Sequence, residues 1–195
     1  MGKIFCIMGK SSTGKDTIYK ALLKDSSLNL KRIVPYTTRP IREGEKQGEE
    51  YFFTDEESMR KLRQEGVIIE ERSYDTFYGV WKYFTVDDSQ IDLAKQDYLM
   101  IGTPESFLSV RDYFSGDRTV PILINLDDGI RLQRALDREK LQSEPKYEEM
   151  CRRFLADAKD FSKEQLENCG ITVSFPNEDL NECIHNITAY IQQNR

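Results

Sequence analysis

The sequence is poor in the residues that most often build metal and nucleophile sites. Its 195 residues include one histidine, one tryptophan and four cysteines. Cys6, Cys151, Cys169 and Cys183 have neither C-x-x-C nor zinc-site spacing, so we expect reduced thiols in a cytoplasmic protein. His185 lies in an expected C-terminal helix, apart from any motif, and we expect it to be structural.

Long apolar runs and an excess of positive charge are also missing. No run reaches the roughly 18 to 20 residues of a membrane span, and MGKIFCIMGK lacks the long apolar region and cleavage site of a signal peptide. The 28 basic and 34 acidic residues give a net charge of −6, which argues against a broad nucleic-acid surface. The chain length fits one globular domain with a small insertion.

Short apolar runs alternate with helical periodicity along most of the chain. This alternation predicts an α/β fold in which a parallel sheet is flanked by helices. Residues 36–86 break the alternation and are expected to form a small inserted subdomain. Expected strands cover residues 3–8, 31–35, 67–70, 78–84, 98–101, 120–125 and 171–175; expected helices cover residues 16–23, 55–65, 148–167 and 180–192. Thr103 is placed to cap one further helix, and Asp127 or Asp128 can cap another.

A glycine-rich loop follows the first expected strand. In MGKSSTGKDT, residues 8–17, Gly9, Gly14 and Lys15 have the G-x4-G-K spacing of a phosphate-binding loop, or P-loop. In such a loop, backbone N–H groups and the next helix N-terminus surround phosphate oxygens, and the lysine adds a positive charge. The residues expected to bind ATP here are Gly9, Ser11, Ser12, Thr13, Gly14, Lys15, Asp16 and Thr17.

Asp16 stands where this loop usually has a hydroxyl residue that binds Mg²⁺, and Thr17 still offers a hydroxyl next to it. A carboxylate beside triphosphate is costly unless a cation or helix N–H groups compensate it. Two interpretations stay open. Asp16 bonds the first-turn amides and points away from phosphate, or it belongs to the Mg²⁺ shell, directly or through water. Thr17 and Asp16 are therefore the expected metal residues.

A basic and aromatic stretch, YTTRPIREGEKQGEEYFF, covers residues 36–53. Arg39 and Arg42 lie on either side of a proline, and Tyr51 follows nine residues later. Two guanidinium groups and a phenol can hold one phosphate group between them. A solvated charged loop is the alternative, but the rigid TTRP and the glycines favour a clamp.

Together, the P-loop, the motif TTRPxRxGExxGxxYxF, a following acidic residue and a Tyr-Gly pair resemble the guanylate kinase family, over almost the whole chain. The resemblance implies ATP-dependent phosphorylation of GMP to GDP with Mg²⁺. It implies a CORE of residues 1–35 and 87–195, an NMP-binding insertion of residues 36–86 and a LID at about residues 138–152. ATP and GMP would be the partners, without nucleic acid or membrane, in a monomer or a homodimer.

The resemblance also assigns the acceptor site. Glu70 would accept protons from guanine, because a carboxylate pairs with the N1–H and amino group of guanine but would face the N1 lone pair of adenine. Glu71 is adjacent, and Glu70 is chosen for its spacing from the Tyr-Gly pair. The residues implied to grip the GMP phosphate are Arg39, Arg42, Tyr51 and Tyr78.

Three positions depart from the family. Pro35 and Val80 stand where serines are usual, and Thr103 lies near the usual place of an aspartate. Loss of these groups leaves strict guanine selection open. Another nucleoside or deoxynucleoside monophosphate is therefore the alternative substrate.

Arginines recur in RLQRALDREK and in the next helical segment. Arg134, Arg138 and Arg153 match LID arginines that close on the transferred phosphoryl group, with Arg152 as the alternative register for Arg153. Asn177 matches a loop near the ATP adenine, and a helix-capping role for its Asn-Glu-Asp cluster is equally open. The catalytic set expected from the resemblance is Lys15, Arg39, Arg134, Arg138 and Arg153.

Two other classes of protein stay open as alternatives. One is an inert guanylate-kinase-like binding module, which typically lacks the P-loop lysine and the clamp, whereas this chain keeps Lys15, Arg39 and Arg42. The other is a P-loop hydrolase, which would leave the clamp unexplained.

Overall fold

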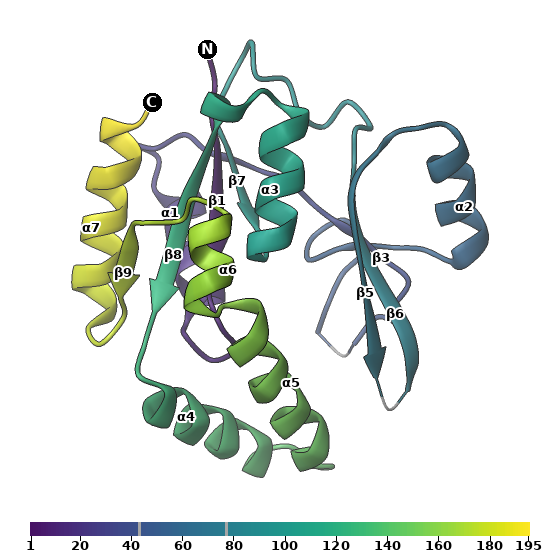
Figure 1. Ribbon diagram of the computed structural model, residues 1–195, viewed down its shortest axis with the longest axis vertical. Coiled ribbons are helices and arrows are strands. Elements are labelled where there is room, and N and C mark those ends of the chain that lie inside the picture. Colours follow the sequence, from purple (N-terminus) through teal and green to yellow (C-terminus); the bar gives the residue numbers. More distant parts are fainter. Residues whose placement is uncertain (43, 77) are drawn as a thin grey trace.

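The computed structural model describes residues 1–42, 44–76 and 78–195, and two sheets stand side by side in it (Figure 1). The larger sheet has five strands in the order β2-β7-β1-β8-β9, all paired in parallel, which confirms the expected parallel sheet. Its strands are β1 (Ile4–Met8), β2 (Lys31–Arg32), β7 (Tyr98–Ile101), β8 (Thr119–Asn125) and β9 (Ser174–Pro176). Of the strand expected at residues 31–35, only Lys31–Arg32 is a strand. The strand expected at residues 171–175 lies instead at Ser174–Pro176.

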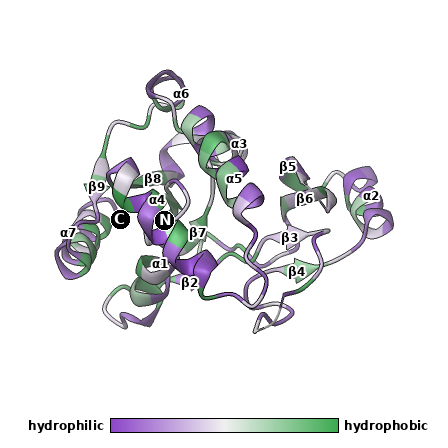
Figure 2. Ribbon diagram, turned by 90° about the horizontal axis from the view of Figure 1, so that it is seen from below, coloured by the Kyte–Doolittle hydropathy of each residue, from purple (hydrophilic) through white to green (hydrophobic). Residues whose placement is uncertain are grey.

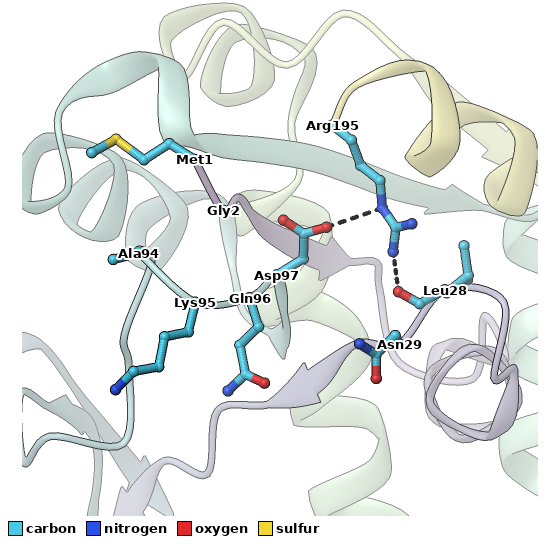
Figure 3. A pocket seen from close by; sticks show the side chains of 9 residues that line it. All are labelled: Met1, Gly2, Leu28, Asn29, Ala94, Lys95, Gln96, Asp97 and Arg195. Atoms are coloured by element: carbon cyan, nitrogen blue, oxygen red, sulfur yellow. Dashed lines mark hydrogen bonds and ion pairs between the residues drawn. The ribbon is translucent and has the colours of Figure 1, made fainter.

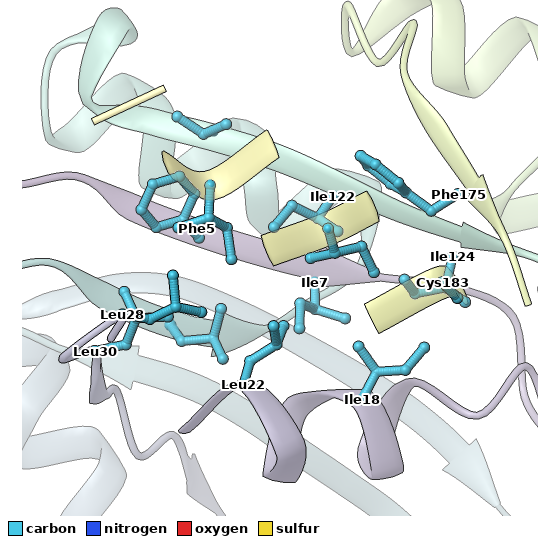
Figure 4. Packing of buried hydrophobic residues seen from close by; sticks show 14 residues of the cluster. Phe5, Ile7, Ile18, Leu22, Leu28, Leu30, Ile122, Ile124, Phe175 and Cys183 are labelled. Atoms are coloured by element: carbon cyan, nitrogen blue, oxygen red, sulfur yellow. The ribbon is translucent and has the colours of Figure 1, made fainter. Parts of the chain in front are cut away.

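Helices cover both faces of this sheet. On one face, α1 (Lys15–Lys24) and α7 (Leu180–Gln193) pack on β1 and β8, and Figure 4 shows Ile18 and Leu22 of α1 pointing toward Ile7. On the other face, α3 (Pro104–Tyr113) packs with Ile4, Cys6 and Met8 of β1. Alternate residues of β1 therefore pack into two separate apolar layers, one on each face of the sheet. This is expected for a strand that is buried on both sides.

The second sheet is formed by residues 36–86, which we call the insertion. Its strands are β3 (Tyr36–Thr37), β4 (Phe52–Phe53), β5 (Ile68–Thr76) and β6 (Gly79–Val86), in the order β4-β3-β6-β5. Helix α2 (Glu56–Gln64) covers one face, where Met59 packs on Phe84 and Val86. The strands expected at 67–70 and 78–84 prove to be parts of a longer antiparallel hairpin, because the pairing of β5 and β6 continues to Thr76 and Gly79.

Two chain segments connect the insertion to the larger sheet, and a side chain ties them together. The amide of Gln90 accepts a hydrogen bond from Val34 N at 2.8 Å and donates one to Val34 O at 3.3 Å. One segment precedes β3 and the other follows β6. The insertion is therefore attached through a joined pair of segments.

Below the larger sheet in Figure 1, α4 (Asp128–Lys140) and α5 (Tyr147–Asp160) form what we call the arm, residues 128–160. The single helix expected over residues 148–167 is wrong: α5 ends at Asp160 and α6 (Lys163–Asn168) follows. Ser162 causes the break, since its side chain accepts a hydrogen bond from Gln165 N and caps α6. Short η1 (Gly116–Arg118) precedes β8.

Two of the predicted helix caps are confirmed. Thr103 and Ser106 form a reciprocal capping box at the start of α3, and the Asp127 side chain accepts from Gly129 N and Ile130 N at α4. Hydropathy follows burial, with β7 apolar and α2 largely hydrophilic (Figure 2). In the part of the chain that the structure describes, no helix combines the length and apolarity that a membrane crossing demands.

Candidate active site

The P-loop joins β1 to α1 at the carboxyl edge of the larger sheet. Ser12 (φ 64°) and Gly14 (φ 89°) take left-handed conformations, which turn the backbone around the loop. Gly14 is the N-cap of α1, and glycine has no side chain that could cap the helix. The start of α1 therefore offers backbone N–H groups and the positive end of its dipole, which is the arrangement that binds phosphate.

Asn177, expected near adenine or at a helix cap, lies behind the loop. Its buried side chain donates from Nδ2 to Thr13 O at 2.7 Å, while Asp179 caps α7 by accepting from Glu182 N. A Cβ at Gly9 would come within 2.8 Å of Ile124 O and of Thr13 Oγ1, so no larger residue fits there. Asn177 thus holds the shape of the loop, a contact that its position in sequence did not reveal.

A carboxylate from the arm touches the loop. Asp157 of α5 accepts a hydrogen bond from Ser11 N at 2.6 Å. Arg131 of α4, whose side chain is fully buried, donates to Ser11 O at 2.9 Å and lies 3.5 Å from Asp157 Oδ2. Sequence reasoning did not assign a role to Asp157 or Arg131, because their partners are more than 100 positions away. One loop amide that could bind phosphate is therefore already bonded to an acid.

Asp16 and Thr17 are exposed in the first turn of α1. Across residues 1–42, 44–76 and 78–195, no group of three or more His, Cys, Asp or Glu side chains could hold a metal ion. Mg²⁺ commonly keeps several waters and binds through one or two protein ligands plus substrate phosphates. One carboxylate and one hydroxyl beside a phosphate loop fit that mode of binding, and they do not fit a closed protein cage.

The clamp residue Arg39 is 3% exposed and is held by a neighbouring acid. Its Nη1 and Nη2 donate to the two oxygens of Glu45 at 2.9 and 2.8 Å. Burial alone would raise the pKa of Glu45, but hydrogen bonds from Arg39 and from Arg42 N hold it below its usual value. The two-pronged geometry that would bind a phosphate is thus occupied by a carboxylate.

Tyr51 lies beside this clamp. The guanidinium carbon of Arg39 lies 5.3 Å from the centre of its ring. Burial raises the pKa of Tyr51 to about 12, and the charges of Arg39 and Asp16 are among the further influences on it. Tyr51 therefore packs against the guanidinium of Arg39, as the expected clamp requires.

Two other clamp residues lie near the hairpin end of the insertion. Arg42 stands over the ring of Trp81 at 5.9 Å, and Tyr78 stacks on Trp81 with ring centres 6.0 Å apart. Lys146, between α4 and α5, lies 4.7 Å from the centre of the Tyr78 ring. A hollow of about 340 Å³ opens here between the hairpin and the arm. Tyr78 thus borders the arm rather than Arg39.

Glu70 and Glu71 face opposite sides of the insertion sheet. Glu71 pairs with Arg63 of α2 at 2.7 Å. Glu70 is 4% exposed and is bonded to Arg72 and Thr85. The choice of Glu70 over Glu71 as the residue that binds guanine stays a prediction.

The expected LID arginines differ in their surroundings. Arg134 and Arg138 are exposed on α4, and neither is in an ion pair within the described residues. Arg153 lies 3.7 Å from both Glu139 and Glu149, and its Nε is buried without a hydrogen-bond partner in the described part of the chain. Arg152, the alternative register, is bonded to both oxygens of Glu149 at 2.8 and 2.7 Å.

The three departures from the family have distinct environments. Pro35 is half-buried next to β3, and Val80 is 51% exposed near the hairpin turn. The Thr103 hydroxyl is engaged at the start of α3, where it accepts from Ser106 N. None of the three offers a free hydroxyl or carboxylate to a base.

A second hollow, of about 360 Å³, lies at the other end of the larger sheet, near both chain ends (Figure 3). Arg195 extends into it, pairs with Asp97 at 3.0 Å and donates to Leu28 O. No residue expected to bind ATP or GMP lines this hollow. Its lining is Met1, Gly2, Leu28, Asn29, Ala94, Lys95, Gln96, Asp97 and Arg195.

We compared the chain with protein families, with curated proteins and with solved structures. The family model described as guanylate kinase matches residues 1–92, which include the P-loop and the insertion. The resemblance to the guanylate kinase family is confirmed. The guanylate kinase of Anaplasma phagocytophilum is 38% identical over 81 residues, 41% of this chain and 39% of that relative. The guanylate kinase of Syntrophomonas wolfei is 37% identical over 90 residues, 46% of each chain.

The matched residues thus span less than half of the length of these curated guanylate kinases. A solved structure extends the likeness in fold. The crystal structure of guanylate kinase from Anaplasma phagocytophilum superposes with a TM-score of 0.64 at 23% identity, over 98% of this chain and 85% of that one. The chain therefore has the guanylate kinase fold, including residues beyond 92 where the sequence match ends.

Proposed function

We propose that this protein transfers the terminal phosphoryl group of ATP to GMP, giving ADP and GDP. The observation that carries the proposal is the pairing of two anion sites. A P-loop followed by a helix that begins at Gly14 lies on the larger sheet, and Arg39 with the neighbouring Tyr51 lies on the insertion. The family match covers both sites. A hydrolase needs only the first site.

In this reaction, the bond from the γ-phosphorus to the β–γ bridging oxygen breaks, and its electron pair stays on ADP. A new bond forms to an oxygen of the GMP phosphate, which is already anionic, so no protein nucleophile is needed. Catalysis then consists of alignment and charge neutralisation. Lys15 and the α1 amides would hold the ATP phosphates, and Mg²⁺, when bound, would neutralise part of their charge. Arg39 and Arg42 would screen the acceptor phosphate.

The contacts in the resting structure support anion binding at both sites. Glu45 occupies the Arg39 clamp and Asp157 bonds a P-loop amide. Each carboxylate accepts hydrogen bonds where a phosphate oxygen would accept them. Binding of each nucleotide would displace one acid. Arg134, Arg138 and Arg153 would then follow the transferred charge as the arm closes and excludes water.

A second candidate is a kinase for another nucleoside or deoxynucleoside monophosphate. The observation that favours it is the loss of polar groups at Pro35 and Val80. An inert binding module is the third, and it would bind nucleotides without turnover.

A panel of monophosphates separates these candidates. We expect ADP release with ATP and Mg²⁺ to be faster with GMP than with AMP, CMP, UMP or the deoxynucleotides. A preference for another base would favour the second candidate, and binding without turnover the third. Lys15→Ala should lower kcat by about 100- to 1,000-fold, since it removes a charge that faces the transferred group. Lys20→Ala, exposed on the same helix, is the matched control and should keep full activity.

A further inference from the structure

We propose that Arg72 reads the acceptor base together with Glu70, by donating a hydrogen bond to a carbonyl oxygen of that base. For guanine this oxygen is O6. The inference rests on the proposed function, since it concerns the same acceptor site. It adds a specificity-determining residue that lies two positions after Glu70 on strand β5 (Figure 1).

A β-bulge directs these side chains toward the larger sheet. The register of β5 with β6 shifts between Ile68 and Glu70, so Ile69 is an extra residue. Ile68 packs with the α2 cluster, whereas Ile69 packs with the cluster that contains Cys6 and Phe107. After the bulge, strand alternation places Glu70, Arg72 and Tyr74 on one face. Bulges often re-aim side chains next to active sites.

The Arg72 guanidinium is only partly used. Its Nε donates to Glu70 Oε2 at 2.9 Å and its Nη2 donates to Glu70 Oε1 at 3.3 Å. Thr85 Oγ1 donates to Glu70 Oε1 at 2.7 Å. Glu70 takes two of the five N–H groups of the guanidinium, and the phenol of Tyr74 is a further hydrogen-bond partner of Arg72. Two N–H groups then remain for other acceptors. The Arg72 side chain is 12% exposed and Glu70 is 1% exposed, so the pair is nearly enclosed but still accessible at the arginine.

The surroundings of Arg72 identify the space that it borders. The neighbouring Ile69 packs in the apolar cluster that contains Cys6 of β1. Strand β5 packs against α3, which begins at the carboxyl edge of the larger sheet. Arg72 therefore lies on the strand of the insertion that borders the larger sheet. In agreement, burial raises the pKa of Cys6 and the charge of Arg72 acts against that rise.

An adjacent donor and acceptor pair has a chemical preference. Guanine offers the O6 acceptor next to the N1–H and amino donors, so Arg72 can bond O6 while Glu70 accepts from N1–H. Adenine offers a donor at its 6-amino group and an acceptor at N1. The 6-amino donor would then face the Arg72 donor, and the N1 acceptor would face the Glu70 carboxylate. Uracil can offer O4 to Arg72 and N3–H to Glu70, but it places its O2 acceptor near the second carboxylate oxygen, where guanine places its amino group. The pair therefore favours a 6-oxo purine.

This assignment accounts for the missing hydroxyls at Pro35 and Val80. Glu70 alone satisfies the donors of guanine but leaves O6 without a donor. A buried polar atom without a partner costs binding energy, and discrimination between bases follows from that cost. Arg72 supplies the donor from β5 in place of groups from the neighbouring strands.

The test compares GMP with 6-thio-GMP, which keeps N1–H and the amino group but replaces O6 with sulfur, a weak acceptor. We expect the chain to favour GMP by about 10- to 100-fold in kcat/KM, as a charged hydrogen bond permits. Arg72→Gln should bring this ratio close to one. Arg63→Gln is the matched control, because Arg63 forms the equivalent ion pair with Glu71 on the opposite face, and it should leave the ratio unchanged.

Calorimetric binding of both nucleotides to the same proteins separates this inference from the proposed function. Turnover of GMP with an unchanged ratio in Arg72→Gln would overturn the inference alone. Binding of GMP with an Arg72-dependent ratio but no turnover would support the inference and reject the kinase activity. Loss of GMP binding in the unaltered chain would reject both. If Arg72→Gln fails to fold, Arg72→Lys keeps a charge beside Glu70 but lacks the planar fork, and it should lower the ratio partway.

Discussion

At the scale of single residues, two carboxylates stand beside a loop that suits phosphate. Asp157 already accepts from Ser11 N, and Asp16 is exposed in the first turn of α1. They differ in what they can do. A bonded acid competes with an incoming anion, while an exposed acid at a helix start can accompany a cation. No carboxylate follows β7 at Thr103, so Asp16 is proposed to supply part of the negative charge on the metal side.

Asp16→Ser should therefore raise the Mg²⁺ concentration needed for half-maximal turnover, because one metal-side charge is removed. The measurement is a Mg²⁺ titration of ADP release at fixed ATP. Asp25→Asn is the control, because Asp25 lies just after the other end of α1. An unchanged Mg²⁺ curve in Asp16→Ser would leave Asp16 as an ordinary helix-start residue.

The four thiols should differ sharply in reactivity. Cys151 is exposed, whereas Cys6, Cys169 and Cys183 are buried. Burial raises the pKa of Cys6 to about 12 and that of Cys183 to about 11, so little of the reactive thiolate forms near neutral pH. Titration with a chromogenic disulfide should give one fast thiol in the native chain and four after denaturation. A second fast thiol would contradict the burial described above.

At the scale of elements, the arm is fastened to the P-loop by polar contacts. Arg131 is bonded to Ser11 O and to Asp128, and Asp157 is bonded to Ser11 N. In the proposed reaction, ATP would have to compete with Asp157 for the loop amide. This contact links the position of α5 to the occupancy of the loop.

Asp157→Asn keeps a hydrogen-bond acceptor but removes the charge that repels phosphate. We expect the Kd for ATP to fall by about three- to tenfold at moderate salt, and the change to shrink as salt increases. Isothermal titration calorimetry provides the measurement. Asp137→Asn, which changes an exposed carboxylate of α4, should leave the Kd unaltered. Weaker ATP binding in Asp157→Asn would mean that Asp157 organises the loop instead.

Whether a feature could be predicted from sequence depended on how far apart in the chain the interacting residues lie. The P-loop, the Thr103 cap and the parallel sheet follow from spacings of a few residues, and sequence predicted them. The end of α5 at Asp160 was missed, although Ser162 has a local capping signal. The contacts of Asp157, Arg131 and Asn177 with the loop could not be predicted, because each joins residues at least 120 positions apart.

At the scale of the whole molecule, the insertion and the arm meet where Tyr78 and Lys146 lie. Lys146 lies over the ring of Tyr78, and Tyr78 stacks on Trp81. The insertion thus carries the single tryptophan, and the arm carries the single exposed cysteine, Cys151. Trp81 can therefore act as a fluorescence donor on the insertion, and Cys151 can carry a thiol-reactive dye on the arm.

Closure should increase energy transfer from Trp81 to an acceptor dye on Cys151 when a non-hydrolysable ATP analogue and GMP are both present. Either nucleotide alone should give a smaller change, because each would displace only one of the resting carboxylates. The unlabelled chain corrects for direct effects of GMP on tryptophan emission, and Cys151→Ser checks the labelling. Transfer that stays constant with both ligands would argue against closure.

The tie between Gln90 and Val34 limits how such a motion can occur. The two hydrogen bonds couple the segment that precedes β3 to the segment that follows β6. We therefore expect the insertion to move as one body that bends about this pair of segments. The distance between Arg39 and the P-loop would then describe the degree of closure.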